Sequence, residues 1–125
     1  MPEIFDSLSN TVIGAAIHVH RVLGPGLLES AYDECLTWAL TRRRILVERQ
    51  QLLPIIFEGY RANAAYRIDL LVEKRLIVEI KTVERVLPVH EAQLRTYLKL
   101  SGLKTGLLFN FFVPVMKDGI RRMSM

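Results

Sequence analysis

The sequence predicts an α/β fold, an α+β sandwich in which helices flank a mixed sheet of four to five strands, in the order helix, helix, three strands, helix, strand. Two observations predict it. Apolar residues recur every three or four positions over residues 8–44, whereas they alternate or form short runs over residues 47–81. The chain also has 125 residues, of which 50% are hydrophobic and 24% are charged, as is typical of one globular domain. We therefore expect a single domain over residues 1–125.

Two helices are predicted in the first third of the chain. Asp6 or Ser7 can cap the first one, because their side-chain oxygens accept hydrogen bonds from the free N–H groups of a first helical turn. The Gly-Pro-Gly run at residues 24–26 ends this helix, since glycine adopts the left-handed conformation after a helix and proline cannot continue one. The second helix is expected over residues 27–44, which contain neither glycine nor proline.

Three strands are predicted next. Residues 47–57 are rich in residues that favour strands, and Glu58-Gly59 follows as a turn. Residues 66–72 and 76–81 alternate in polarity, with three charged residues between them. Because consecutive strands with short connections usually lie side by side, these three are expected to form an antiparallel meander.

A third helix and a last strand complete the predicted fold. Pro88 suits the first turn of a helix, which Ser101-Gly102 ends. Residues 104–112 are typical of a buried strand. A helix between two strands implies a right-handed crossover to a parallel neighbour, so the predicted sheet is mixed.

The connection between the second and third strands decides which charged side chains lie together. A two-residue loop would place Asp69 opposite Val78, on the apolar face of the sheet. A three-residue loop instead pairs Val72 with Leu76 and places Asp69 directly opposite Glu79. The second register keeps every charge on one face, and register follows the hydrophobic pattern. The sequence therefore predicts two adjacent carboxylates.

Two adjacent carboxylates repel each other by roughly 4 kcal/mol at ~4 Å and an effective dielectric constant of about 20. A shared proton, a cation or exposure to water must compensate for this repulsion. Lys81 lies two residues from Glu79 on the same face and supplies one positive charge. A divalent metal would supply two, and oxygen ligands suit magnesium or manganese. The alternative is an exposed patch of salt bridges, which contributes little to stability.

Three further side chains belong to faces that can meet this pair. Glu29 precedes Tyr32 and Leu36 at spacings of three and four, which predicts that it faces the sheet. An acid in a first helical turn is also favoured by the helix dipole alone, so that alternative stays open. Gln93 and Tyr97 are four residues apart and share one face of the third helix, where a half-exposed polar pair is the alternative.

The segment Gly26-Leu-Leu-Glu29-Ser-Ala-Tyr32 matches the motif after which the GxxExxY proteins are named. These proteins form a group within the PD-(D/E)XK nuclease superfamily, also called restriction-endonuclease-like. The resemblance extends over nearly the whole chain, through Val19-His20, Gly24-Pro25-Gly26, Asp69, Glu79-Ile80-Lys81, His90-Glu91-Ala92-Gln93, Tyr97, Asn110-Phe111 and Gly119-Ile120. It implies a restriction-endonuclease-like core, a mixed sheet between helices.

The resemblance also implies a metal site that binds Mg²⁺ or Mn²⁺. Asp69 and Glu79 correspond to the two acids that hold the metal in the superfamily, with the carbonyl of Ile80 as an additional ligand. Glu29 resembles the helix-borne acid that completes the metal shell in several branches. The metal ligands implied are therefore Asp69, Glu79, Ile80 and Glu29.

The remaining implied residues are catalytic. Lys81 resembles the lysine that orients the attacking water and stabilises charge on the phosphate. Gln93 and Tyr97 resemble the Q-x-x-x-Y motif of the RecB-like branch, which lines the site. The implied catalytic set is Glu29, Asp69, Glu79, Lys81, Gln93 and Tyr97. The expected activity is metal-dependent hydrolysis of phosphodiester bonds in nucleic acid, with DNA as the expected partner.

Two other function classes stay open. The first is a non-catalytic module that binds nucleic acid or protein and retains the nuclease fold. The presence of both acids and of Lys81 argues against it, because a site that has lost its catalytic activity usually lacks one of these residues. The second is a hydrolase of a small phosphorylated molecule, but the sequence has no glycine-rich phosphate loop. The formal charge of +4 is compatible with nucleic acid.

Composition also bears on location and assembly. Cys35 is the single cysteine, so no intramolecular disulfide forms, and we expect a cytoplasmic protein without a signal peptide. The longest stretch without Asp, Glu, Lys or Arg covers residues 7–20, which is too short to span a membrane. Residues 109–116 are unusually apolar, and either the core or a homodimer interface accounts for them.

Overall fold

The computed structural model describes the backbone of residues 2–125 and the side chains of residues 7–125. The described chain forms an α+β fold with a five-stranded mixed sheet, as the sequence predicts. The elements in chain order are α1 (Pro2–Leu23), α2 (Glu29–Arg42), β1 (Val47–Phe57), β2 (Tyr60–Val72), β3 (Leu76–Lys81), α3 (Pro88–Ser101), β4 (Thr105–Asn110), the 3₁₀ helix η1 (Met116–Gly119) and β5 (Ile120–Ser124).

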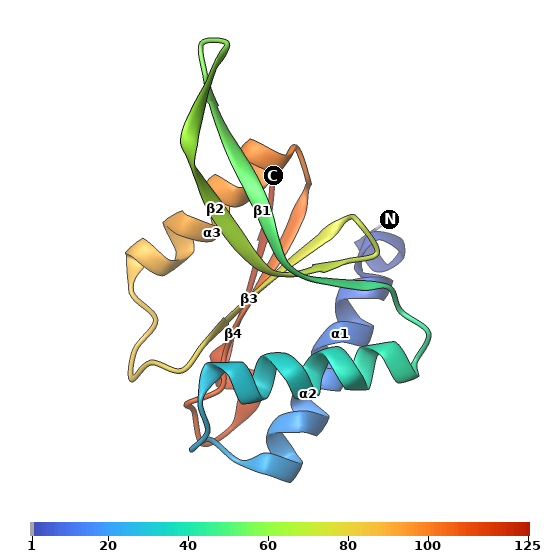
Figure 1. The fold of residues 1–125 in the computed structure, drawn as a ribbon. Helices are drawn as coiled ribbons and strands as arrows, with labels where there is room; N and C mark the ends of the chain where they lie inside the picture. Colours follow the sequence, from blue (N-terminus) through green and yellow to red (C-terminus); the bar gives the residue numbers. More distant parts are fainter. Residues whose placement is uncertain (1) are drawn as a thin grey trace.

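The strands follow one another across the sheet in the order β1-β2-β3-β4-β5. The first three form the predicted antiparallel meander, and α3 carries the chain from β3 to its parallel neighbour β4. β5 then pairs antiparallel with β4. Figure 1 shows α1 and α2 on one side of the sheet and α3 on the other, with the long β1–β2 hairpin extending beyond the helices.

Each face of the sheet has its own apolar core, because side chains alternate between the two faces along a strand. On one face, Val78 and Phe109 pack with Leu36 of α2 and with residues of α1. On the other face, Ile77 packs with Leu94 of α3 and with β4. β3 is therefore buried on both sides, which explains its nearly continuous apolar sequence.

The turn between β2 and β3 has the predicted length of three residues. Val72 pairs with Leu76, and Leu71 pairs with Ile77. Glu73 and Lys74 adopt φ angles of 52° and 56°, the left-handed conformation that closes the turn. The register that the charge alternation predicts is thus the observed one.

The helix boundaries differ from the predicted ones. α1 begins at Pro2 and not at Asp6 or Ser7, because proline fits the first turn and the intervening residues continue the helix. The side chain of Asp6 lies outside the described residues. α2 is shorter at both ends, since Leu28 is extended and Arg44 adopts a φ of 61°.

Two strand features were not predicted. β2 starts six residues earlier than expected, at Tyr60, directly after the two-residue turn formed by Glu58 and Gly59. The early part of β2 contains small and polar residues that do not alternate, so its pattern gives no strand signal. β5 is a short edge strand with exposed Arg121 and Arg122, which do not favour strands in a sequence.

Tyr32 fastens the loop between α1 and α2. Its ring is fully buried and stacks on Phe111, with 4.4 Å between the ring centroids and 7° between the planes. Its hydroxyl donates a hydrogen bond to the carbonyl of Gly24 and accepts one from the N–H of Leu27. The motif tyrosine therefore fixes where α2 begins, and with it the position of Glu29.

Asn110 fixes the chain where β3 ends. This buried side chain accepts a hydrogen bond from the N–H of Val83 at 3.0 Å and donates one to the carbonyl of Val83 at 2.8 Å. The N–H of Phe111 donates to the carbonyl of Lys81 at 2.9 Å. Asn110, the last residue of β4, and the following residue Phe111 thus hold the backbone on both sides of Thr82.

The apolar segment near the C-terminus is mostly core. Phe109, Phe111 and Met116 are buried in the cluster on the α1/α2 face. Phe112 and Val115 stay exposed, so a homodimer contact there remains a prediction. Across the described residues, none of the helices combines the length and hydropathy needed to cross a membrane.

Gly119 has no room for a side chain. A Cβ at this position would lie 2.2 Å from the carbonyl oxygen of Asn110, whereas a Cβ at Gly14 of α1 would meet no atom within 4 Å. We expect Gly119→Ala to lower the free energy of unfolding by about 1–3 kcal/mol. Gly14→Ala should raise it by about 0.5–1 kcal/mol, because alanine favours a helix. Urea denaturation checks both, and equal effects of the two variants would contradict this packing.

Candidate functional site

Asp69 and Glu79 lie side by side at the point where regular pairing between β2 and β3 stops. The last regular pair is Leu70 with Val78. Beyond it, the N–H of Ile80 donates to Oδ2 of Asp69 at 2.8 Å, and the N–H of Asp69 donates to Oε2 of Glu79 at 2.9 Å. Each carboxylate therefore takes the place of a backbone acceptor on the facing strand, which fixes both acids against the sheet.

The two carboxylates are short of positive charge. Burial, followed by the neighbouring charge of Asp69, raises the pKa of Glu79 from 4.5 to about 8. Burial also raises the pKa of Asp69, although the hydrogen bond from Ile80 opposes this. Only 4% of Glu79 is exposed to solvent. One proton or one cation is therefore needed to stabilise the pair at neutral pH.

Lys81 lies on the α3 side of the carboxylate pair, in a cavity of 420 Å³. Its Nζ donates a hydrogen bond to Oε1 of Gln93 at 3.2 Å, so the helix side chain holds the ammonium group. Tyr97 is buried in the same cavity beside Tyr66, with ring centroids 5.3 Å apart. Burial, followed by the charges of Glu79 and Asp69, raises the pKa of Tyr97 to about 12. Its phenol is therefore neutral at physiological pH.

A second cavity, of 460 Å³, lies on the α2 side of the pair. Asp69, Ile80 and Glu29 all contribute to its lining. Glu29 lies at the first position of α2 and is exposed to solvent, and it shares this cavity with the two sheet residues.

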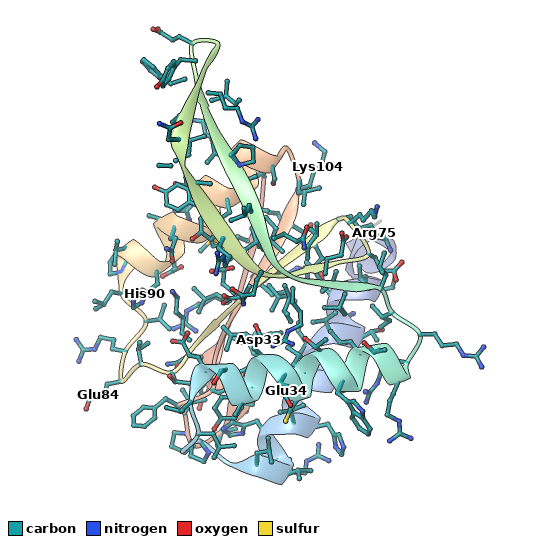
Figure 2. All side chains as sticks on the ribbon, viewed as in Figure 1. Asp33, Glu34, Arg75, Glu84, His90 and Lys104 are labelled. Atoms are coloured by element: carbon teal, nitrogen blue, oxygen red, sulfur yellow. The ribbon has the colours of Figure 1, made fainter. Side chains whose placement is uncertain are left out.

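The structure thus divides the predicted residues between two cavities on either side of the carboxylate pair. Lys81, Gln93 and Tyr97 share the α3 side, and Glu29 and Ile80 share the α2 side with Asp69. Figure 2 shows Asp33 on α2 and His90 at the start of α3, one from each side. Within the described part of the chain, no three His, Cys, Asp or Glu side chains lie close enough to hold a metal ion by themselves.

The residues nevertheless fit a divalent cation of the magnesium type. Mg²⁺ is usually bound by one or two carboxylates and completed by waters and substrate phosphates, not by an all-protein cage. Asp69 and Glu79 provide two such carboxylates, each with only one oxygen engaged by a backbone N–H among the described residues. Their raised pKa values indicate an uncompensated negative charge that a divalent cation would neutralise.

Three residues of the α2-side cavity were not predicted. Asp33 is buried and forms a salt bridge with Arg49 at 2.6 Å, and Gln50 donates a hydrogen bond to the same carboxylate at 3.2 Å. Asp33 follows Glu29 by four residues, so helical spacing could have identified it. The positions of Arg49 and Gln50 could not be inferred, because β1 departs from regular geometry at Gln50, where φ is 53°.

His90 has a structural role at the edge of the α3-side cavity. Its Nδ1 accepts a hydrogen bond from the N–H of Leu87 at 2.9 Å, which caps the start of α3. This contact holds the first turn of the helix that carries Gln93 and Tyr97. The side chain therefore supports the site through the helix.

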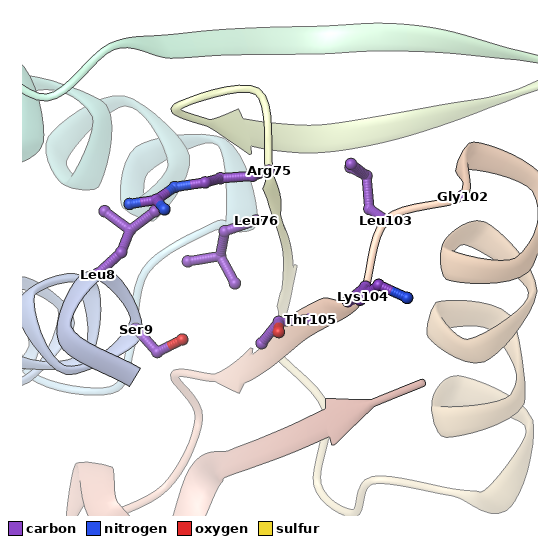
Figure 3. A pocket seen from close by; sticks show the side chains of 8 residues that line it. All are labelled: Leu8, Ser9, Arg75, Leu76, Gly102, Leu103, Lys104 and Thr105. Atoms are coloured by element: carbon purple, nitrogen blue, oxygen red, sulfur yellow. The ribbon is translucent and has the colours of Figure 1, made fainter. Parts of the chain in front are cut away.

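A third cavity lies at the opposite end of β3. Figure 3 shows its lining side chains, among them Arg75, Lys104, Ser9 and Thr105. Its volume is 340 Å³, and none of the residues that line it is acidic. This cavity therefore offers no carboxylate for a metal, and the chemistry of the candidate site stays at the Asp69–Glu79 end of β3.

A family model described as the PD-(D/E)XK nuclease superfamily matches residues 6–123. The chain belongs to the PD-(D/E)XK nuclease superfamily. Its acidic pair and Lys81 lie on β2 and β3, within the matched residues, in the order that the superfamily name describes. The proline of that name is replaced by Ile68.

The PD-(D/E)XK domain is also similar to a solved structure titled "Crystal structure of SSO0001". The TM-score is 0.53 and the sequence identity is 22%, which shows the fold alone. The alignment covers 97% of this chain and 59% of that one, so the chain spans only part of the length of its structural relative. No curated protein sequence matches the chain.

The raised pKa values in this PD-(D/E)XK domain predict how stability depends on pH. The folded state binds the proton of Glu79 more tightly than the unfolded state does, so the free energy of unfolding should fall as pH rises from about 4.5 to about 8. The slope is at most about 1.4 kcal/mol per pH unit from this group. Asp69 acts in the same direction. Denaturation in EDTA at several pH values measures this fall.

Glu79→Gln tests the assignment to this residue, because the amide still accepts the hydrogen bond from Asp69 but does not ionise. The variant should lose most of the fall in stability with pH. Glu84→Gln is the matched control at an exposed position and should behave like the wild type. An unchanged pH dependence in Glu79→Gln would contradict the buried, proton-binding carboxyl.

Proposed function

We propose that this protein is a metal-dependent nuclease that hydrolyses phosphodiester bonds of nucleic acid, with DNA as the substrate and Mg²⁺ or Mn²⁺ as the cofactor. The single observation that carries the proposal is the Asp69–Glu79 carboxylate pair, fixed by backbone hydrogen bonds and followed by Lys81 on the same strand. Membership of the superfamily supports the same activity class.

Asp69 and Glu79 would hold the cation, with the carbonyl of Ile80 and the carboxylate of Glu29 nearby on the α2 side. A bound divalent cation supplies positive charge that polarises a phosphate oxygen and makes a water molecule more acidic. The backbone hydrogen bonds to both carboxylates keep them in place before substrate binds. Glu29 is exposed, so its contribution would be electrostatic or through water.

Lys81, Gln93 and Tyr97 would act on the other side of the pair. The ammonium group of Lys81 is a positive charge that acts on both carboxylates, and it would stabilise charge on the phosphate and orient the attacking water. Gln93 holds this group through its amide oxygen. Tyr97 keeps its proton, so its phenol is available as a neutral hydrogen-bond donor.

The chain is further proposed to belong to the GxxExxY group of the superfamily. The motif residues support this through separate roles. Tyr32 fastens the loop that contains Gly26, and the loop sets the start of α2. Glu29, at that start, lines the cavity with Asp69. The motif would thus deliver one acid to the site.

A cytoplasmic location and a homodimer remain predictions. Cys35 is a free thiol, which suits a reducing compartment. Phe112 and Val115 expose apolar surface beside the end of β4, where a second copy could pack. Size-exclusion chromatography with light scattering of the wild type tests the dimer.

Cleavage of a substrate panel tests the proposed activity. Linear, nicked, branched and single-stranded DNA and RNA are incubated with Mg²⁺ or Mn²⁺. We expect cleavage of at least one DNA substrate, and Lys81→Ala should slow it by about 100-fold or more because charge stabilisation at the phosphate is lost. Lys104→Ala removes an exposed lysine at the far end of β3 and should leave the rate unchanged.

The outcome also separates the two leading function classes. Nucleic-acid binding without cleavage of any substrate would contradict the nuclease and favour the non-catalytic module. Equal loss of activity in Lys81→Ala and Lys104→Ala would contradict the role of Lys81. Circular dichroism of each variant confirms that the fold is retained.

A further inference from the structure

Asp33 holds a guanidinium group in the α2-side cavity. Only 5% of Asp33 is exposed, and its Oδ1 lies 2.6 Å from both Nε and Nη2 of Arg49. Its Oδ2 accepts the hydrogen bond from Gln50. The Arg49 side chain itself is 45% exposed. The buried carboxylate of Asp33 thus fixes the position of the guanidinium group of the half-exposed Arg49.

The backbone of β1 is distorted in a way that produces this arrangement. Neighbouring residues of a regular strand point to opposite faces, yet Arg49 and Gln50 both reach the carboxylate of Asp33. Gln50 adopts a φ of 53°, which is unusual for a residue other than glycine. Irregular strand residues of this kind redirect side chains and are frequent beside active sites.

The distortion occurs directly across from the candidate metal ligand. Arg49 pairs with Leu70 and Gln51 pairs with Ile68, so the intervening Gln50 stands opposite Asp69 in the register of β1 and β2. Arg49 and Asp69 consequently line one cavity. β1 brings a positive charge to the side of the pair that Lys81 does not reach.

The charged residues that line this cavity indicate a binding role for Arg49. Glu29, Asp33 and Asp69 line it, and Arg49 is the single basic residue among those that do. A nucleic-acid strand that approaches the carboxylate pair from this side carries negative phosphates and meets three acids. No acceptor in the described chain uses Nη1 of Arg49, so that nitrogen is available. Because Asp33 already fixes the side chain, binding costs little conformational entropy.

We propose that Arg49 forms a phosphate-binding subsite in the α2-side cavity, which binds a backbone phosphate of the nucleic acid next to the phosphodiester that is cleaved. Asp33 and Gln50 are positioning residues, because they orient the guanidinium and do not contact the substrate. This subsite rests on the proposed nuclease function. It gives the site one cation on each side of the carboxylate pair, Lys81 and Arg49.

The salt dependence of binding tests the subsite. The affinity for a fluorescent single-stranded oligonucleotide is measured by anisotropy in EDTA, between about 50 and 200 mM NaCl. We expect Arg49→Ala to reduce the slope of log K against log[NaCl] by about 0.7, the effect of one lost phosphate contact on a single strand. Arg49→Lys should keep most of the slope but bind more weakly, since lysine has no planar fork to hold against Asp33.

Two further variants make the result decisive. Arg75→Ala removes an exposed arginine from the turn before β3, where it lines the separate cavity with Lys104 and Thr105, and should leave the slope unchanged. Asp33→Asn/Arg49→Ala removes the buried carboxylate together with its partner, so it tests the same loss if Arg49→Ala does not fold.

Each outcome is interpretable. The subsite would be overturned if the wild type binds and the slope is unchanged both in Arg49→Ala and in Asp33→Asn/Arg49→Ala. That result would leave the nuclease proposal standing. No binding by the wild type in EDTA at any salt concentration would overturn the subsite alone if cleavage in Mg²⁺ or Mn²⁺ is retained, and absence of both binding and cleavage would overturn both proposals. An equal decrease of the slope in Arg75→Ala would show that charge in general, and not this subsite, determines binding.

Discussion

The repulsion between Asp69 and Glu79 is the constraint on which the rest of the site depends. The three-residue turn at the end of β2 places these acids next to each other, and two backbone N–H groups keep them there. Burial prevents water from screening them, so both pKa values rise. A fold retains such a pair only where something else compensates for its charge, and a cation brought in by function is the simplest compensation.

The surrounding structure serves to present this pair. Tyr32 fixes the loop before α2, and Asn110 fixes the chain after Lys81, so the segments on both sides of the carboxylates are tied to the core. The cavities on the two sides then differ in character. The α3 side holds an ammonium group and a neutral phenol, whereas the α2 side holds acids and one clamped arginine. A substrate phosphate would thus encounter different donors on the two sides of the pair.

The sequence alone predicted the parts of the site in which polarity alternates regularly along a strand. It did not predict the parts in which the backbone is irregular. The register that joins Asp69 to Glu79 followed from charge alternation and loop length, because a slip by one residue would have placed Asp69 opposite Val78, on the apolar face. The exact start of α2, and with it the exposure of Glu29, did not follow from the sequence, since it depends on how Tyr32 fixes the preceding loop. The pairing of Arg49 with Asp33 could not be predicted. It requires the left-handed backbone at Gln50, which tertiary contacts impose and composition does not encode.

Binding of Mn²⁺ to the purified protein tests the central claim most directly. Electron paramagnetic resonance counts the bound ion without any substrate, so the result does not depend on finding the correct nucleic acid. The proposed metal site predicts one bound Mn²⁺ per chain, with affinity weakened by about tenfold or more in Asp69→Asn and in Glu79→Gln because each removes a charged ligand, and unchanged in the exposed control Glu84→Gln. Binding of Mn²⁺ to Asp69→Asn/Glu79→Gln as tightly as to the wild type would contradict it.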